Sequence, residues 1–467
     1  MRQRAPLLVL LAIAVACVSG SDATAPRTHH WMQYATPADG GYDATGLERA
    51  RSLATDAGSA AVMAISDGRV VAAWGDVERK LELHSVRKSI YAALWGIAEE
   101  RGLVRLDATL ASLGVDDLQP LTAEEKRATV ADLLRARSGV YHPAAYAASD
   151  DEAARPARGA HAPGTHWYYN NWDFNVAGAL LEQIAGKPLG VLFDEWIARP
   201  IGMEDYTATD VFAVLEPRTS RWPALTFRMS TRDLARFGQL WLDRGRWNGT
   251  QIVPEAWIDR ASTAASETGP GQGYAMMWWT YDGGALNAER YPAASRHSIL
   301  LARGTGGQTI FIVPDAKLVV VHRGDTDHGK PVGGREVWTM FDRILGAKSG
   351  MPAERPRLIA LRAEPFPGQP PPFEWPAPVA LEPAALEHLT GDYEIAPGVT
   401  ATIYLHDGRL FASMPREGEA ELFARSASEH YLRVDPSVTL RFDLEPSGRA
   451  RAVRVNLRGR EIVAVRR

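Results

Sequence analysis

A proline-rich stretch divides this 467-residue chain into two parts of different character. Proline fixes its own backbone angle and cannot donate a backbone hydrogen bond, so a cluster of prolines interrupts both helices and sheets. Six prolines stand at positions 367, 370, 371, 372, 376 and 378. We therefore expect residues 349–383 to form a stiff, extended linker between one domain at residues 28–348 and another at residues 384–467.

The part before the linker has strand patterns at both ends and helical patterns between them. Apolar runs separated by short turns, typical of paired strands, lie at 60–65 with 70–74 and at 309–313 with 318–321. Helical spacing of apolar residues fills the middle, to about residue 260. This order predicts an α/β domain in which one sheet is assembled from distant segments and a helical insert faces one end of it.

The part after the linker has a different pattern. Six short runs typical of strands lie at 400–405, 410–414, 430–434, 438–444, 452–457 and 461–465. Turn signals, Asp-Gly at 407 and Ser-Gly at 447, separate some of these runs. So many short strands in so few residues predict a small all-β domain, either a sandwich or a barrel.

The charge balance of the chain bears on its partners. The formal net charge is −4, and 46% of the residues are hydrophobic. This composition is typical of a globular protein with a full core. Without a basic excess, nucleic acid is not expected as a partner.

The first residues have the features of an export signal. Arg2 and Arg4 precede an apolar run from residue 5 to residue 18, which is too short for a comfortable membrane span. Cys17, the only cysteine, follows the small residues 14–16, and this stretch resembles a bacterial lipobox. The alternative is an ordinary signal peptide that happens to contain a cysteine. We expect residues 1–17 to direct export, to the periplasm or to a membrane to which a lipidated Cys17 attaches the protein.

Ser85 and Lys88 stand where a helical pattern begins that continues to about residue 100. Positions three apart share one face of a helix, so the Lys88 amine can lie beside the Ser85 hydroxyl. A serine hydroxyl needs a neighbouring base to become a good nucleophile, and a desolvated lysine can serve as that base. Of the seven lysines in the chain, only Lys88 has a serine three places before it. The pair predicts a nucleophile with its base.

A second motif follows at residues 163–171, which read Pro-Gly-Thr-His-Trp-Tyr-Tyr-Asn-Asn. This stretch resembles the Tyr-x-Asn motif of the serine β-lactamase and penicillin-binding-protein superfamily, in which a Ser-x-x-Lys helix comes first. Two registers fit, one starting at Tyr168 and one at Tyr169. The preceding Pro-Gly and the following Phe174 favour Tyr169 and Asn171 as the motif residues, with Tyr168 as a packing residue.

The closest similarity is to the class C branch with its related esterases and D-aminopeptidases, and it covers roughly residues 41–348. Segments 133–140 and 230–238 also resemble the family pattern. The resemblance implies a β-lactamase or DD-peptidase-like antiparallel sheet flanked by helices, with an all-helical insert. The C-terminal part resembles the small lipocalin-like β domain that is often appended to these hydrolases.

The third family motif, Lys-Thr-Gly or His-x-Gly, has an altered counterpart here. Residues 302–308 read Ala-Arg-Gly-Thr-Gly-Gly-Gln and lead into a predicted strand. They resemble the Gly-Gly-Gln variant of esterase-like members, and either Gly304 or Thr305 occupies the position of the family lysine. A strand without bulky side chains can approach a substrate closely and offer a backbone N–H.

The resemblance assigns a role to each of these residues. Ser85 would attack a carbonyl, Lys88 and Tyr169 would move the proton, and Asn171 would orient Lys88 and the substrate. The remaining substrate-binding or oxyanion positions are Gly306, Gly307, Gln308 and Arg303, of which Gly307 or Gln308 would offer the second oxyanion N–H and Arg303 a replacement charge. We expect an exported serine hydrolase of a small-molecule or peptide substrate, favouring an ester or a non-carboxylated amide, with no metal or organic cofactor. The alternative is a non-catalytic receptor or regulator that binds peptidoglycan or a peptide.

Other chemistries lack their signatures in this sequence. There is no Gly-x-Ser-x-Gly elbow and no His-Glu-x-x-His motif. A metal cluster is conceivable at His322, Asp325, Asp327 and His328, but a solvated turn is the favoured interpretation. Four tryptophans near the motifs are candidates for an apolar acyl pocket or for core packing: Trp167, Trp172, Trp278 and Trp279.

Overall fold

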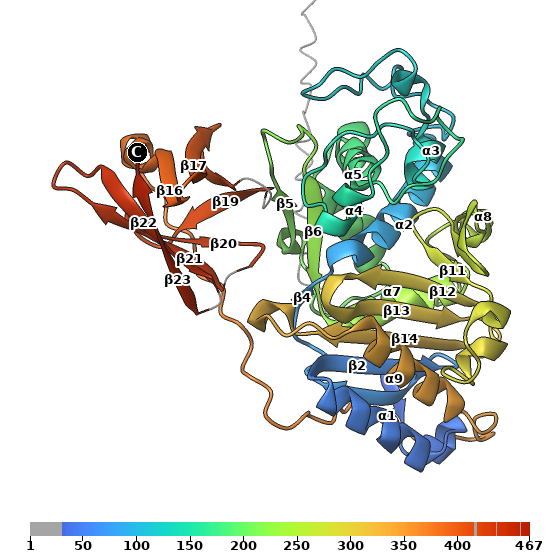
Figure 1. Ribbon diagram of the computed structural model, residues 1–467. Helices are drawn as coiled ribbons and strands as arrows, with labels where there is room; N and C mark the ends of the chain where they lie inside the picture. The colour runs from blue at the N-terminus through green and yellow to red at the C-terminus, as the bar shows by residue number, and fades with distance from the viewer. Residues whose placement is uncertain (1–29, 415–417, 436, 458) are drawn as a thin grey trace, which may run out of the picture.

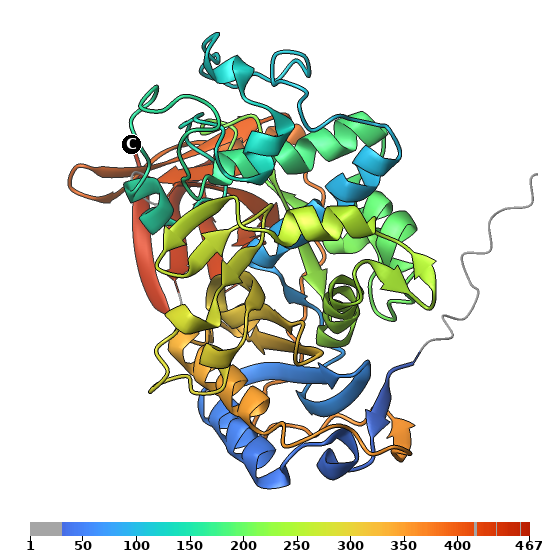
Figure 2. The same ribbon diagram turned by 90° about the vertical axis from the view of Figure 1, so that its right-hand side faces the viewer.

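The computed structural model describes residues 30–414, 418–435, 437–457 and 459–467. They form a larger α/β domain and a smaller β domain (Figure 1). The smaller domain stands beside the larger one in Figure 1 and behind it in Figure 2. Cys17 and the expected signal peptide lie outside the described residues.

A ten-stranded sheet forms the centre of the larger domain, in the order β15-β1-β3-β2-β14-β13-β12-β11-β10-β9. Neighbouring strands are antiparallel except for β1 with β3. The early and late strand pairs join where β2 pairs with β14, so the predicted assembly from distant segments is confirmed. The strands are β1 (Met32–Tyr34), β2 (Ser59–Ser66), β3 (Arg69–Gly75), β9 (Ser266–Gly269), β10 (Gln272–Tyr274), β11 (Trp279–Tyr281), β12 (Ile299–Gly304), β13 (Gln308–Val313), β14 (Leu318–Gly324) and β15 (Leu358–Ala360).

Helices cover both faces of this sheet. α1 (Ala44–Asp56) packs with α9 (Gly334–Gly346) on one face, and α2 (Arg87–Glu100) with α7 (Thr231–Leu242) contributes to the core on the other. Strand β2 shows the consequence, because Ala61 and Met63 belong to one core and Val62 and Ala64 to the other. A strand buried on both faces is apolar throughout, which explains the uninterrupted apolar run in its sequence.

The insert between β3 and β9 is not entirely helical, which corrects one detail of a fold class that is otherwise confirmed. A three-stranded sheet, β4-β6-β5, lies within it. Its strands are β4 (Leu81–Glu82), β5 (Val211–Val214) and β6 (Ala224–Met229), and a small hairpin pairs β7 (Arg246–Trp247) with β8 (Thr250–Gln251). Such short strands leave little periodic signal in a sequence. The other helices of the domain are α3 (Val130–Leu134), α4 (Ser149–Ala153), α5 (Asn171–Ala185), α6 (Leu189–Phe193) and α8 (Glu255–Ser262).

The smaller domain is a closed barrel of the strands β16 to β23 in chain order. β16 pairs with β23, which closes the barrel and leaves no exposed sheet edge. Two of its strands, β16 and β19, were not predicted from the sequence. The elements are α10 (Pro383–Leu389), β16 (Gly391–Ala396), β17 (Val399–His406), β18 (Arg409–Met414), β19 (Gly418–Ala424), β20 (Glu429–Leu432), β21 (Val438–Leu444), β22 (Ala450–Leu457) and β23 (Arg460–Arg466).

The proline-rich segment is extended, but it follows the surface of the larger domain. Its strand β15 extends the main sheet by pairing with β1. Phe366 is buried in the core under α1 and α9, and the Gln369 side chain donates to the Ala60 carbonyl at 2.6 Å. Because these contacts hold the segment to the larger domain as far as Gln369, the residues after Gln369 make the connection to the barrel.

Within the described part of the chain, no single helix has both the length and the apolar character needed to cross a membrane; α5 passes that test only jointly with residues 189–198, and the two are bent by 77°.

Candidate active site

Ser85 lies in a short helical turn, His84–Val86, that leads directly into α2. Its Oγ accepts a hydrogen bond from Lys88 Nζ at 2.8 Å. Just before the turn, the Leu83 N–H donates to the carbonyl of Phe227 on β6 at 2.9 Å. The serine is therefore fixed at the N-terminal end of α2, where the helix dipole favours negative charge.

Lys88 is 2% exposed, and no carboxylate forms an ion pair with it among the residues that the structure describes. Its Nζ donates to two hydroxyls, Ser85 Oγ and Tyr169 Oη, each at 2.8 Å. Burial, and then the charge of Arg87, lower the pKa of Lys88 well below its ordinary value of 10.5. A neutral amine in this position can accept the Ser85 proton.

Tyr169 completes the chain of polar groups. Burial raises the pKa of its phenol to about 12, while a hydrogen bond with Ser85 acts in the opposite direction. Its ring stacks on Trp279 with centroids 5.5 Å apart, which fixes its direction. Tyr168 instead donates its hydroxyl hydrogen to the carbonyl of Asp151. Of the two tyrosines, it is thus Tyr169 whose hydroxyl reaches Lys88.

Asn171 does not occupy the place expected for it. Its side-chain amide donates to Asp151 Oδ2 at 3.0 Å, and no hydrogen bond joins it to Lys88 among the described residues. Asn170 caps α5 by accepting from the Trp172 N–H at 3.2 Å, so it has a structural role. Asp151, on α4, lines the site but belongs to none of the sequence motifs. Burial raises its pKa, against the opposing effects of Asn171 and Lys88.

The glycine-rich stretch runs against the turn that holds Ser85. A Cβ on Gly304 would stand 2.5 Å from the Leu83 carbonyl oxygen and 3.1 Å from the Ser85 nitrogen. Only glycine permits this approach, and it brings the end of β12 to the nucleophile. Gly306 and Gly307 follow with φ angles of +76° and +88°, which favour glycine.

Arg303 and Gln308 at the two ends of this stretch lie differently. The Arg303 guanidinium lies 4.9 Å from the centroid of the Trp279 ring, at the cavity described below. Gln308 is fully buried, donating to the Gly324 carbonyl at 2.9 Å and accepting from Arg323 at 2.6 Å. Its side chain holds β13 to β14 and does not line that cavity.

A cavity of about 580 Å³ opens beside Ser85. Its polar lining includes Ser85, Tyr169, Asp150, Asp151 and Arg303, together with the backbone from Gly304 to Gly307. A larger cavity of about 1060 Å³ lies between α7, α8 and strand ends, and none of the motif residues line it. The chemistry-bearing residues therefore converge on the smaller cavity.

The four tryptophans near the motifs separate into two pairs. Trp167 and Trp279 line the cavity, and their rings pack edge to face with centroids 5.9 Å apart. Trp172 and Trp278 are fully buried in the core of the larger domain. Only the first pair can contact a ligand.

The segment after β14 is a buried ion-pair cluster, so its interpretation as a solvated turn was wrong. Asp325 accepts from both terminal nitrogens of Arg79, one of them at 3.2 Å, and Asp327 accepts from Arg228 at 3.0 Å. His322 lies apart and contacts Ser59 and the Gly307 carbonyl. The described residues contain no group of acidic, cysteine or histidine side chains with the arrangement of a metal site. The carboxylates of Asp325 and Asp327, which a metal would need as ligands, are already paired with arginines.

Comparison with solved structures finds similar chains at low identity. An octameric penicillin-binding protein homologue from Pyrococcus abyssi is 14% identical, with 90% of this chain and 100% of that chain covered and a TM-score of 0.47. EstCE1, a hydrolase with promiscuous acyltransferase activity, is 18% identical (66% and 98% covered, TM-score 0.46). A beta-lactamase from Mycobacterium bovis is 22% identical (62% and 95% covered, TM-score 0.43).

None of the curated proteins compared with the chain matches it. The sequence profile of the family described as Beta-lactamase, however, matches residues 44–335, which is more than half of the chain. The matched region includes the Ser85 turn, the Tyr169 motif and the glycine-rich end of β12. The chain therefore belongs to the beta-lactamase family of serine hydrolases.

Proposed function

We propose that this protein hydrolyses neutral esters or amides through an acyl-enzyme on Ser85. The observation that carries the proposal is the chain from Ser85 Oγ through Lys88 Nζ to Tyr169 Oη, with both distances at 2.8 Å. A buried amine that hydrogen-bonds only to hydroxyls is suited to take a proton and to return it.

In the proposed reaction, Ser85 Oγ attacks the carbonyl carbon while Lys88 takes the hydroxyl proton. The oxyanion of the tetrahedral intermediate faces the Ser85 N–H and the backbone of the glycine-rich stretch. When the intermediate collapses, the proton passes from Lys88 by way of Tyr169 to the leaving alcohol or amine. Water then attacks the acyl carbon and loses a proton to Lys88. As the bond between the acyl carbon and Ser85 Oγ breaks, Lys88 passes this proton to Oγ, and the carboxylic acid is released.

The charges around the cavity support a substrate without a carboxylate. Asp150, Asp151 and Arg303 all line the cavity, and the Arg303 guanidinium lies over the Trp279 ring. The family lysine of the third motif is absent at both Gly304 and Thr305. An anionic substrate would meet two carboxylates and one arginine, so we expect poorer turnover of anionic than of neutral esters.

A fluorophosphonate reagent, which phosphonylates activated serines, tests the nucleophile. We expect one adduct per chain by intact mass, and none in Ser85→Ala. Ser89→Ala is the matched control, because Ser89 lies on the same helix and donates to the Met277 carbonyl at 2.9 Å. Undiminished labelling of Ser85→Ala would refute the assignment.

Turnover separates an enzyme from a receptor of the same fold. We expect p-nitrophenyl butyrate to give an initial burst of product, and the p-nitrophenyl hemiester of glutaric acid, which has a similar chain with a carboxylate, to react more slowly. A protein that only binds peptidoglycan or a peptide gives no burst with either ester. Equal rates with both esters would show that the charges around the cavity do not select against anionic substrates.

We also propose that the protein is exported and attached to a membrane through a lipid on Cys17. The support is the Arg2 to Cys17 sequence pattern. The full-length chain, expressed in a Gram-negative host with radiolabelled palmitate, is expected to incorporate label, whereas Cys17→Ala is not. An unlabelled chain whose mature N-terminus lies at another residue would favour an ordinary signal peptide.

A further inference from the structure

Tyr146 lies behind the nucleophile turn and has an unusual backbone. Its φ is +60°, a left-handed conformation that a bulky aromatic residue rarely adopts. His84, directly before Ser85, has a φ of +47°. Two such residues in contact at a candidate active site indicate a geometry that the surrounding structure enforces.

The phenol of Tyr146 joins two buried groups. It donates to Glu82 Oε1 at 2.6 Å and lies 2.7 Å from His84 Nδ1. Since a phenol has one hydrogen and Glu82 receives it, His84 Nδ1 must carry its own hydrogen and donate to the phenol oxygen. His84 Nε2 is then the acceptor toward Thr326 Oγ1 at 3.3 Å. The Tyr146 ring also stacks on the His84 ring at an interplanar angle of 18°.

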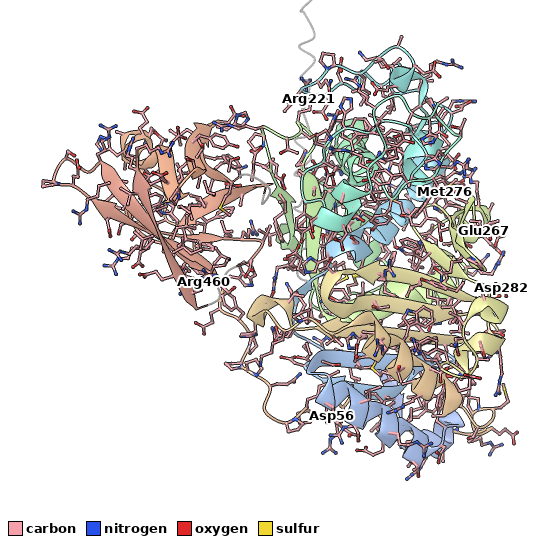
Figure 3. All side chains as sticks on the ribbon, in the orientation of Figure 1. Asp56, Arg221, Glu267, Met276, Asp282 and Arg460 are labelled. Carbon is pink, nitrogen blue, oxygen red and sulfur yellow. The ribbon has the colours of Figure 1, made fainter. Side chains whose placement is uncertain are left out.

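The other side of Tyr146 connects to the barrel. Its backbone N–H donates to Glu216 Oε1 at 2.8 Å. Glu216 lies in the loop between β5 and β6, which Arg221 marks in Figure 3 and which faces the barrel. The Tyr146 ring packs on an apolar cluster of Phe212, Val214 and Ala224, against which Val434 of the barrel also packs.

Polar contacts fix that loop to the barrel strand β19. Glu419 accepts from Thr219 Oγ1 at 2.9 Å and from the Arg218 N–H at 3.2 Å. The Arg218 guanidinium lies 3.5 Å from the centroid of the Tyr404 ring, and Tyr404 donates to Glu419. The barrel thus holds Arg218 and Thr219, at side-chain and backbone atoms, within the 216–219 loop.

We propose that Tyr146 is a positioning residue that ties the Ser85 turn to the barrel interface, so that docking of the barrel sets the reactivity of Ser85. The route runs from Glu419 through the 216–219 loop and Glu216 to Tyr146, and then through His84 to Ser85. This inference rests on the proposed acylation of Ser85 for its kinetic consequence. Tyr146 is not a catalytic residue, because its phenol contacts His84 and Glu82 and it does not line the cavity beside Ser85.

The first experiment changes the phenol alone. Tyr146→Phe keeps the ring but removes the acceptor for His84 Nδ1–H and the donor to Glu82. We expect the rate constant for fluorophosphonate labelling, and kcat for p-nitrophenyl butyrate, to fall about 10- to 100-fold with little change in KM, because the nucleophile loses its orientation. Nitrogen NMR of ¹⁵N-histidine protein, with His84 assigned by its loss in His84→Gln, reports the tautomer without any substrate. Its Nδ1–H signature should be lost in Tyr146→Phe. An unchanged signature or an unchanged rate would overturn the role of Tyr146.

The second experiment tests the link to the barrel in the full-length protein. Glu419→Ala should lower the labelling rate several-fold in the wild-type background but have little further effect in Tyr146→Phe, since coupled residues are not additive. Glu461→Ala on β23, across the barrel from β19 in strand order, is the matched control and should leave the rate unchanged. Thermal unfolding identifies variants that fail to fold, in which case Glu419→Gln replaces the alanine.

The outcomes also separate this inference from the proposed function. Additive effects of Glu419→Ala and Tyr146→Phe, or equal effects of Glu419→Ala and Glu461→Ala, would overturn the barrel link. If the wild-type protein does not react with the reagent, the proposed function fails. In that case the nitrogen NMR signal of His84 Nδ1–H is the only readout. A change of this signal between wild type and Glu419→Ala supports the structural link, and an unchanged signal overturns it.

Discussion

Two groups of largely buried basic side chains in the α/β domain differ in their partners. Arg79 and Arg228 are paired with the carboxylates of Asp325 and Asp327. Lys88 is more deeply buried, and among the described residues its amine hydrogen-bonds only to the hydroxyls of Ser85 and Tyr169. The arginine cluster joins segments that are distant in the chain. The lysine lacks the carboxylate that would hold its proton, and its pKa is lowered.

The difference shows that fold stability and proton transfer depend on different cationic side chains within one domain. A buried cation with a carboxylate partner is costly to disturb, whereas a buried amine among hydroxyls loses its proton easily. Arginine suits the first role because its charge is essentially permanent, and lysine suits the second because its pKa responds to burial. Changes at the two places should therefore affect different measurements.

The largest effect is expected at Lys88. Lys88→Ala removes the general base, so the acylation rate should fall by about a thousandfold or more, while the thermal unfolding temperature stays near the wild-type value. Lys126→Ala is the control, since its amine pairs with Asp116 at 2.7 Å and is one-third exposed. Stopped-flow labelling and calorimetry measure the two quantities. If Lys88→Ala lost much of its thermal stability but kept its acylation rate, Lys88 would have a structural role and not a catalytic one.

The next effect is expected in the ion-pair cluster. Asp325→Asn removes the nearer of the two carboxylates that pair with the buried Arg79 and leaves only Asp327, at 3.8 Å. The free energy of unfolding should therefore fall by about 3 kcal/mol. Urea unfolding at pH 7 measures it, with Asp107→Asn at an exposed pair as the control that shows no measurable change.

The pH dependence of this effect follows from the pKa of Asp325. Burial by itself raises that pKa, but the hydrogen bonds and charge of Arg79 outweigh burial and lower it below 3.8. The carboxylate therefore stabilises the fold above its unfolded pKa, and this contribution is lost as the pH falls through the lower folded value. The difference in the free energy of unfolding between wild type and Asp325→Asn should therefore become smaller at acidic pH. A constant difference would mean that charge is not its source.

A smaller effect is expected in the pH profile of acylation. The neutral form of Lys88 is the base, so the rate should rise with pH through the lowered pKa and reach its plateau well below 10.5. Labelling rates over a pH series measure the midpoint, and the residual rate of Lys88→Ala should lack this step. A midpoint close to the ordinary value of lysine would show that burial does not tune the amine.

The smallest effect concerns a third kind of buried base, His430 in the barrel. Neither ring nitrogen has a hydrogen-bond partner among the described residues, and burial lowers its pKa from 6.5 to about 4. Because the unfolded chain binds the proton more readily, barrel stability should decline as the pH falls from about 6.5 to about 4. His430→Leu should remove this decline in calorimetric scans. A decline of the same size in the variant would assign it to other groups.

Local sequence was sufficient to predict those features that depend on near neighbours. Ser85 and Lys88 are three residues apart on one helix, so their contact is a property of helical geometry. The strand pairs around residues 66–69 and 313–318 are hairpins, and the residues of their turns can be recognised from the local sequence. Family resemblance then supplied Tyr169, whose hydroxyl does reach Lys88 in the structure.

Other features were decided only when distant segments packed together. Asn171 bonds to Asp151 instead of Lys88, and Gln308 bonds to Arg323, because each side chain takes the partner that the tertiary structure offers it. Strands β5 and β19 gain their stability from pairing with neighbouring strands of the sheet or barrel, which their own residues do not reveal.

The sequence by itself predicted the division into an α/β part and an all-β part, the assembly of the main sheet from distant segments and the contact of Ser85 with Lys88. These features rest on local geometry and composition. The tertiary structure decided that Gly304 touches the Ser85 turn, that arginines fill the acidic turn after β14, and that Tyr146 joins the barrel interface to His84. The physical reason is that burial and polar pairing are set by the partners which folding brings together, and these partners lie far away along the chain.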